Sequence, residues 1–137
     1  MSLDLQQYLE RIGAGDAAAA DLPTLRHIVY RHALAIPFEN LDPFRGVPVS
    51  LDLQDVQRKL VHDRRGGWCF EHNLLLGEAL RAVGFTVHDL AARVLWGRDA
   101  AARTPRTHRL LEVEAEGRQW LVDSGFGGQT PTGILDL

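Results

Sequence analysis

The sequence predicts an α+β fold in which an N-terminal helical bundle precedes a β-rich half. Two observations lead to this prediction. Apolar residues recur at helical spacing as far as Gly84, in segments bounded by glycine, proline and helix-capping residues. After Gly84 the pattern changes to stretches typical of antiparallel strands. We therefore divide the chain into a helical domain over residues 1–84 and a β domain over residues 85–137.

The first helices have clear start and stop signals. Apolar spacing predicts a helix over residues 5–12 and a second helix that begins after Asp21 and is closed by Pro37. Two prolines and a glycine over residues 43–48 predict an irregular crossing with little regular structure.

Two further helices complete the helical half. The third opens at Ser50 or Asp52, because either side chain can cap free N–H groups. A glycine pair then breaks the chain, and the fourth helix begins near Cys69 and stops at Gly84.

The second half is expected to form strands. They are predicted over residues 86–96, 108–113 and 119–123, with a loop over 97–107. The tail 130–137 is expected to begin another element.

Composition and charge exclude several classes of protein. A chain of 137 residues, 45% hydrophobic and 24% charged, is expected to fold as an ordinary domain rather than a disordered tail or a coiled coil. The net charge of −3 gives no support for nucleic-acid binding. No apolar run approaches the roughly 18 residues of a membrane span, and the N-terminus lacks a signal pattern. One cysteine cannot form an internal disulfide, so we expect a cytoplasmic protein without membrane contact.

Cys69 is the candidate nucleophile. It follows two glycines and stands at the predicted start of a helix, where partial positive charge, with Arg64 and Arg65 nearby, favours the thiolate form. Positions 69, 73, 76 and 80 share one helical stripe, so the sulfur faces the layer on which the helix packs. The simpler alternative is a small buried thiol of the core.

His108 and Asp123 are candidates for a hydrogen-bonded pair. If Glu116-Gly117 is a two-residue turn, the residue numbers of each facing pair across the hairpin add up to 233. Asp123 is then a diagonal neighbour of His108. If the loop spans 114–117, the sum is 231 and the two face each other directly. Both arrangements bring the side chains within about 4.5–8 Å on one face, whereas an odd loop would separate them. The alternative is a solvated histidine and an unrelated turn aspartate.

Together these residues have the chemistry of thiol acyl transfer. An imidazole can draw the proton from Cys69, and a carboxylate can fix the imidazole tautomer. The backbone N–H of Cys69 at the helix start can hold a developing oxyanion.

Four separated segments resemble those of the arylamine N-acetyltransferase family. Arg65-Gly-Gly-Trp-Cys-Phe-Glu71 matches the family pattern of Arg-Gly-Gly, a variable residue, Cys, a variable residue and Glu. The likeness extends upstream to residues 36–42 and downstream to 107–110 and 120–128, in the same order, so it covers nearly all of the chain.

The resemblance implies a ping-pong acetyltransferase. Cys69 would accept the acetyl group of acetyl-CoA, with His108 as its base and Asp123 as the orienting acid. Coenzyme A would leave, and an arylamine or hydrazine nitrogen would then take the acetyl group. No metal is expected.

The resemblance also assigns binding and supporting residues. Phe126 and Phe38 would contact the amine, and a glycine-rich loop would approach coenzyme A. The loop glycines are Gly125, Gly127 and Gly128. Arg65 is expected to form a structural ion pair with Glu39 or Glu71 beside the site.

Family members are about twice this long, with a helical domain, a barrel domain and an α/β lid. The resemblance therefore implies a cysteine-protease-like catalytic core, barrel strands in the second half, and no C-terminal lid in this chain. Exposed barrel edges are expected to favour self-association through strand pairing.

Other functions stay open from the sequence. A truncated and inactive acetyltransferase half has the same motifs, and a papain- or transglutaminase-like hydrolase shares the order Cys, His, Asp. Cys69 and His72 have a metal-ligand spacing, but no second pair accompanies them.

Overall fold

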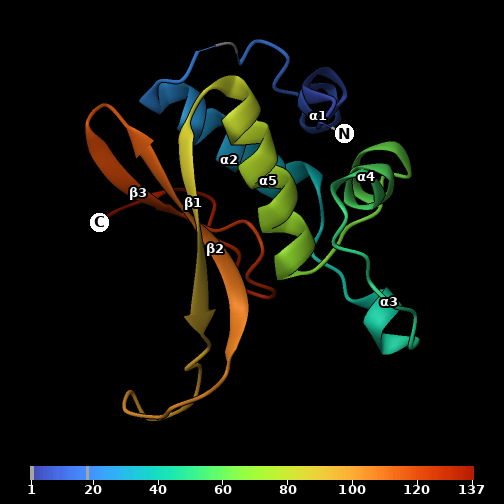
Figure 1. Cartoon of the computed structure of the whole chain (residues 1–137), viewed down its shortest axis with the longest axis vertical. Helices are drawn as coiled ribbons and strands as arrows, with labels where there is room; N and C mark the ends of the chain where they lie inside the picture. Colours follow the sequence, from blue (N-terminus) through green and yellow to red (C-terminus); the bar gives the residue numbers. More distant parts are fainter. Residues whose placement is uncertain (1, 18) are drawn as a thin grey trace.

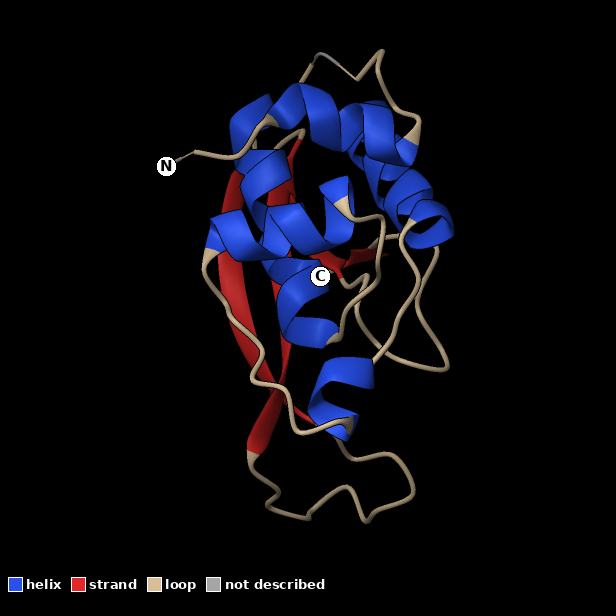
Figure 2. Cartoon of the chain, turned by 90° about the vertical axis from the view of Figure 1, so that its right-hand side faces the viewer, coloured by secondary structure: helices blue, strands red, loops and turns tan. Residues whose placement is uncertain are grey.

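The computed structural model describes residues 2–17 and 19–137. Its helices gather on one side and its strands on the other, with α5 lying across β1 and β2 (Figures 1 and 2). The elements described are α1 (Leu5–Ile12), α2 (Leu22–Ala35), α3 (Leu41–Phe44), α4 (Leu53–Gln57), the π-helix η1 (Arg58–His62), α5 (Cys69–Val83), β1 (Thr86–Arg93), β2 (Arg106–Ala115), β3 (Arg118–Val122) and β4 (Leu135–Asp136). The α+β prediction is confirmed.

Aspartates cap the first two helices; the start at Asp21 was predicted, and the cap at Asp4 was not. Asp4 and Asp21 accept hydrogen bonds from the N–H groups of Gln7 and Thr24, at 3.0 and 2.9 Å. Gly13 ends α1 at a φ of 69°, in the left-handed region that glycine adopts without strain.

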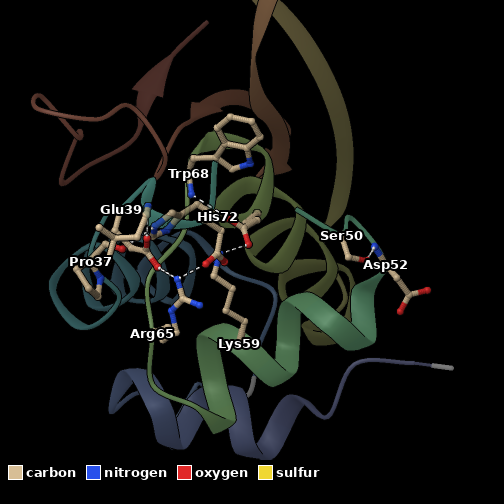
Figure 3. Close-up of polar contacts among 11 residues, drawn as sticks. Pro37, Glu39, Ser50, Asp52, Lys59, Arg65, Trp68 and His72 are labelled. Carbon is tan, nitrogen blue, oxygen red and sulfur yellow. Dashed lines mark hydrogen bonds and ion pairs between the residues drawn. The ribbon is translucent and has the colours of Figure 1, made fainter. Parts of the chain in front are cut away.

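Asp52 caps the third predicted helix. Its carboxylate accepts the N–H of Gln54 at 2.9 Å, and Ser50 accepts the N–H of Asp52 at 3.1 Å (Figure 3). The helix then widens from α4 into η1, which the periodicity did not predict.

The short helix α3 extends into the first two residues of the segment expected to be irregular. Pro43 stands in its first turn, where the missing N–H costs nothing. Residues 45–48 have no helix or strand, so the prediction of little regular structure holds for most of the segment and fails at residues 43 and 44.

The strands pair antiparallel in the order β1-β2-β3-β4 among the described residues. Leu111 faces Val122, so the residue numbers of facing pairs in β2 and β3 add up to 233, as the two-residue turn predicts. Glu116 and Gly117 form that turn with φ values of 52° and 72°. The strand predicted to reach residue 96 ends at Arg93, where the register with β2 shifts.

The described sheet is open, with β1 and β4 at its edges. The tail forms an element as predicted, because Asp136 of β4 pairs with Trp120 of β3. One face of the sheet packs against α5, and a Cβ on Gly77 would meet Leu111 at 3.3 Å. Across the residues placed in the structure, no helix is both long and apolar enough to cross a bilayer.

Candidate active site

Cys69 is the first residue of α5, at the junction with β2. Glu71 fixes this turn by accepting the N–H of Trp68 at 3.1 Å. The Cys69 side chain is half-buried, and its Sγ lies 3.9 Å from the carbonyl oxygen of Thr107 on β2. The predicted position at a helix start, facing a second layer, is therefore confirmed.

His108 and Asp123 are hydrogen-bonded across the end of the sheet. Nε2 of His108 lies 2.6 Å from Oδ2 of Asp123, which directly follows β3. The Cys69 thiol lies near enough to the imidazole to act on its pKa. Since Nε2 is bonded to Asp123, Nδ1 is the nitrogen left for the thiol. The structure thus brings all three sequence-predicted residues together.

The charges of this cluster favour a protonated imidazole. Burial alone would lower the pKa of His108, but hydrogen bonds to Asp123 and Cys69 outweigh burial and raise the pKa to about 9. Burial would raise the pKa of Asp123, yet hydrogen bonds from His108, Asn73 and the Gly125 N–H lower it. An imidazolium and a carboxylate are therefore the stable forms at neutral pH.

Asn73 supports the carboxylate and was missed as a functional residue from the sequence. Its Nδ2 donates to Oδ1 of Asp123 at 3.0 Å and to the Arg109 carbonyl oxygen, and its Oδ1 accepts the Ser124 N–H at 3.1 Å. It lies one turn after Cys69 on the stripe that the periodicity defines, and it is fully buried. A buried amide on the nucleophile's own stripe was the available signal.

Two predicted aromatic residues border the cluster. Phe126 meets the His108 ring edge-on, with centroids 5.3 Å apart. Phe38 is 39% exposed and stacks on His72, with centroids 6.3 Å apart. Phe126 thus contacts His108 itself, and Phe38 contacts a residue about one helical turn after Cys69.

The three predicted loop glycines differ in their surroundings. A Cβ on Gly125 would lie 2.6 Å from Cα of Cys69, and one on Gly127 would lie 2.6 Å from the Phe38 ring. Glycine at these two positions allows the loop to approach α5 and Phe38. Gly128 is exposed, with open space around its Cα.

The acids and bases beside the site form one chain of ion pairs. Arg65 binds Glu39 at 2.9 Å and Asp42 at 2.8 Å, while Lys59 joins Asp42 to Glu71 at 2.8 and 2.7 Å (Figure 3). Arg65 therefore pairs with Glu39 as predicted. The alternative partner, Glu71, pairs with Lys59, because the π-helix places that ammonium over the start of α5.

The pair Cys69 and His72 does not form a metal site. Both ring nitrogens of His72 are engaged in hydrogen bonds to protein groups away from the thiol. Within residues 2–17 and 19–137, no group of three or more His, Cys, Asp or Glu side chains is placed to hold a metal ion.

Comparison with known proteins gives a consistent result. Residues 21–137 match the family model described as N-acetyltransferase. Among curated proteins, the arylamine N-acetyltransferase of Mycolicibacterium smegmatis is 48% identical over 100% of this chain and 51% of its own length. That of Escherichia coli is 46% identical over 97% of this chain and 47% of its own.

Solved structures agree with the sequence comparison. The arylamine N-acetyltransferase from Salmonella typhimurium superposes with a TM-score of 0.92 and 42% identity, covering 100% of this chain and 50% of that one. The Mycobacterium marinum enzyme in complex with CoA gives a TM-score of 0.90 at 48% identity, covering 98% and 51%. This chain spans about half the length of the relatives it matches.

Proposed function

This chain belongs to the N-acetyltransferase family that includes the arylamine N-acetyltransferases, and we propose that its Cys69 carries acetyl from acetyl-CoA to an amine. The acceptor is the nitrogen of an arylamine or hydrazine. The observation that carries this proposal is the Cys69–His108–Asp123 cluster: a hydrogen-bonded imidazole and carboxylate lie beside a thiol at the start of a helix.

The first half-reaction acetylates the enzyme. The Cys69 thiolate attacks the thioester carbonyl carbon, and the first-turn N–H of α5, which the helix leaves without a partner, supports the oxyanion. The C–S bond to coenzyme A then breaks, and His108 gives its proton to the departing thiolate. Acetyl passes from one thioester to another, so this step is nearly balanced in free energy.

The second half-reaction forms the amide. The amine nitrogen attacks the acetyl carbon on Cys69, and neutral His108 takes the proton that the nitrogen loses. The bond to Sγ breaks, which restores the thiolate and the imidazolium. Asp123 stabilises that imidazolium and keeps Nδ1 directed to the sulfur.

The substrates follow from the resemblance and from the neighbouring residues. A relative from Mycobacterium marinum was solved in complex with CoA, which supports coenzyme A as a partner here. We assign the amine to the aromatic surface of Phe38 and Phe126, and the coenzyme A backbone to the loop of Gly125, Gly127 and Gly128.

Several structural expectations belong to the same proposal. They are the division at residue 84, the cysteine-protease-like core, and the role of the open sheet as part of a barrel. The edges of β1 and β4 are proposed to pair with other copies. A cytoplasmic location completes the proposal.

Initial rates with acetyl-CoA and aniline test this function. A ping-pong reaction predicts parallel double-reciprocal lines and no acetyl-aniline from Cys69→Ser. Intersecting lines would contradict the acetyl-enzyme. Release of acetate without any need for amine would favour the hydrolase alternative. No product, with a thiol that still alkylates selectively, would favour the inactive-fragment alternative.

A further inference from the structure

A buried chain of hydrogen bonds joins α1 to the segment before α3. The Tyr8 hydroxyl lies 2.8 Å from Nδ1 of His32, and Nε2 of His32 lies 2.9 Å from Nδ1 of His72. Nε2 of His72 then lies 3.1 Å from the carbonyl oxygen of Pro37. Tyr8 and His32 are fully buried and His72 is 1% exposed. The proposed chemistry uses none of these side chains.

The chain has one direction, which its last member sets. The Pro37 carbonyl can only accept, so Nε2 of His72 carries the hydrogen. Nδ1 of His72 must then accept from His32, and Nδ1 of His32 must accept from the Tyr8 hydroxyl. With His32 in this tautomer, a proton added at Nδ1 of His72 would oppose the Nε2–H of His32. Burial, which lowers the pKa of both histidines, agrees with neutral rings.

The accepting end of the chain lies beside the candidate active site. The Pro37 carbonyl also accepts the Gly67 N–H at 3.3 Å, and the Gly67 carbonyl accepts the Glu39 N–H at 2.9 Å. Phe38 and Gly67 thereby form a parallel bridge two residues before Cys69. Figure 3 shows Pro37, Glu39 and His72 gathered at this point, next to Trp68.

The His72 ring also supports Phe38 directly. The two rings are nearly parallel, at an interplanar angle of 8°. Phe38 also meets Gly127, whose missing Cβ leaves room for the ring. Phe38 is therefore held between α5 and the glycine loop, with part of its surface exposed.

We propose that His72 is a positioning residue for the acceptor side of the site, and that Tyr8 and His32 hold it in the required tautomer. His72 acts through the Pro37 carbonyl and the Phe38 ring, so it fixes the orientation of the ring that we assign to the amine. This inference rests on the proposed function, since it takes Phe38 as a contact of the acceptor.

The test separates the two half-reactions in three variants. His72→Phe keeps a ring but loses the N–H to Pro37, and His72→Gln keeps an N–H near the Nε2 position. His88→Phe, on the exposed side of β1, is the matched control. For His72→Phe, KM for aniline should rise about tenfold, the effect of one lost buried hydrogen bond. The rate of Cys69 acetylation should stay within about twofold, and His72→Gln should recover part of the loss.

An equal loss in both half-reactions, or no change in either, would overturn the proposal.

If the unaltered chain transfers no acetyl, the proposed function fails, and NMR contacts between Phe38 and Gly127 decide the positioning role. Their loss in His72→Phe with retention in His72→Gln supports it, whereas retention in both overturns it. If His72→Phe does not fold, Tyr8→Phe and His72→Gln replace it. In that case nitrogen NMR of the unaltered chain must show that His32 and His72 both carry their hydrogen on Nε2. Hydrogens on Nδ1 of these rings would overturn the proposal.

Discussion

Nε2 of His108 lies 2.6 Å from Oδ2 of Asp123, so an imidazole on β2 and a carboxylate just after β3 form one charged pair. The pair is mostly buried and is held by Asn73 and by the N–H of Gly125. Its geometry links the stability of the fold to the protonation of the proposed base.

The first prediction concerns stability against pH in Asp123→Asn. The pKa of His108 is about 9 in the fold against an ordinary 6.5, so the contribution of its proton is complete below pH 6.5. This contribution to the free energy of unfolding is lost as the pH rises through 9. It amounts to at most about 3 kcal/mol. Urea unfolding should therefore show the wild-type advantage over Asp123→Asn shrinking from pH 6.5 to 9. An advantage that stays constant would contradict the pairing, and exposed Asp99→Asn should show no trend.

Asn73→Ala is expected to destabilise the protein by about 2–3 kcal/mol, because it leaves buried groups without partners. The Ser124 N–H and the Arg109 carbonyl lose their hydrogen bonds, and Asp123 loses one of its donors. Urea unfolding measures the free energy of unfolding, and alkylation measures the reactivity of Cys69. Both the free energy of unfolding and the alkylation rate should fall. Exposed Gln129→Ala should remain within about 0.5 kcal/mol of wild type. Equal stability of the two variants would refute the supporting role.

Gly125→Ala tests the close approach of the loop to α5. Its Cβ would lie 2.6 Å from Cα of Cys69 and 3.1 Å from Nδ2 of Asn73, so backbone must shift, at a cost of about 1–3 kcal/mol. Alkylation of Cys69 should slow, since His108 and the thiol no longer align. Gly133→Ala is the control, because no atom lies within 4 Å of its Cβ position. If both variants alkylate at the wild-type rate, the contact does not align the site.

Lys59→Met tests the ion-pair chain. Removing the ammonium leaves Glu71, which is 2% exposed, without its charged partner, and the expected loss is about 3–5 kcal/mol. The neighbouring Arg58→Met removes an exposed charge paired with Asp55 and should cost less than about 1 kcal/mol. Thermal unfolding distinguishes the two. Similar melting temperatures would show that Glu71 is not dependent on Lys59.

The helices were the most predictable part of the fold, because their signals are local. Asp21 and Gly13 act within one turn, so the sequence contains both partners of each contact. The helix at α3 was missed because Pro43 disfavours a helix except in its first turn, and the preceding residues give no strong start signal. The widening into η1 was also missed, and its Lys59 pairs with Asp42 and Glu71, which no pattern of helical spacing links to it.

The site was predictable where one geometric rule linked its parts. The alternation of side chains along the strands predicted that Asp123 and His108 lie on the same face of the sheet. The choice between the two turns required the register and the φ values at Glu116 and Gly117. Lys59 as the partner of Glu71 was not predicted, since the sequence offered Arg65 and only the fold brings the Lys59 ammonium to that carboxylate. Asn73 was missed because an amide gives no sign of its partner until α5 meets the end of β3.

The most direct test of the central claim is the intact mass of the chain after incubation with acetyl-CoA and no amine. We expect one acetyl group on Cys69, absent in Cys69→Ala, and lost when aniline is added. Peptide mapping identifies the residue that carries it. Acetyl on another residue, or a mass unchanged while Cys69 remains reactive to alkylation, would contradict the claim that this chain carries acetyl on Cys69.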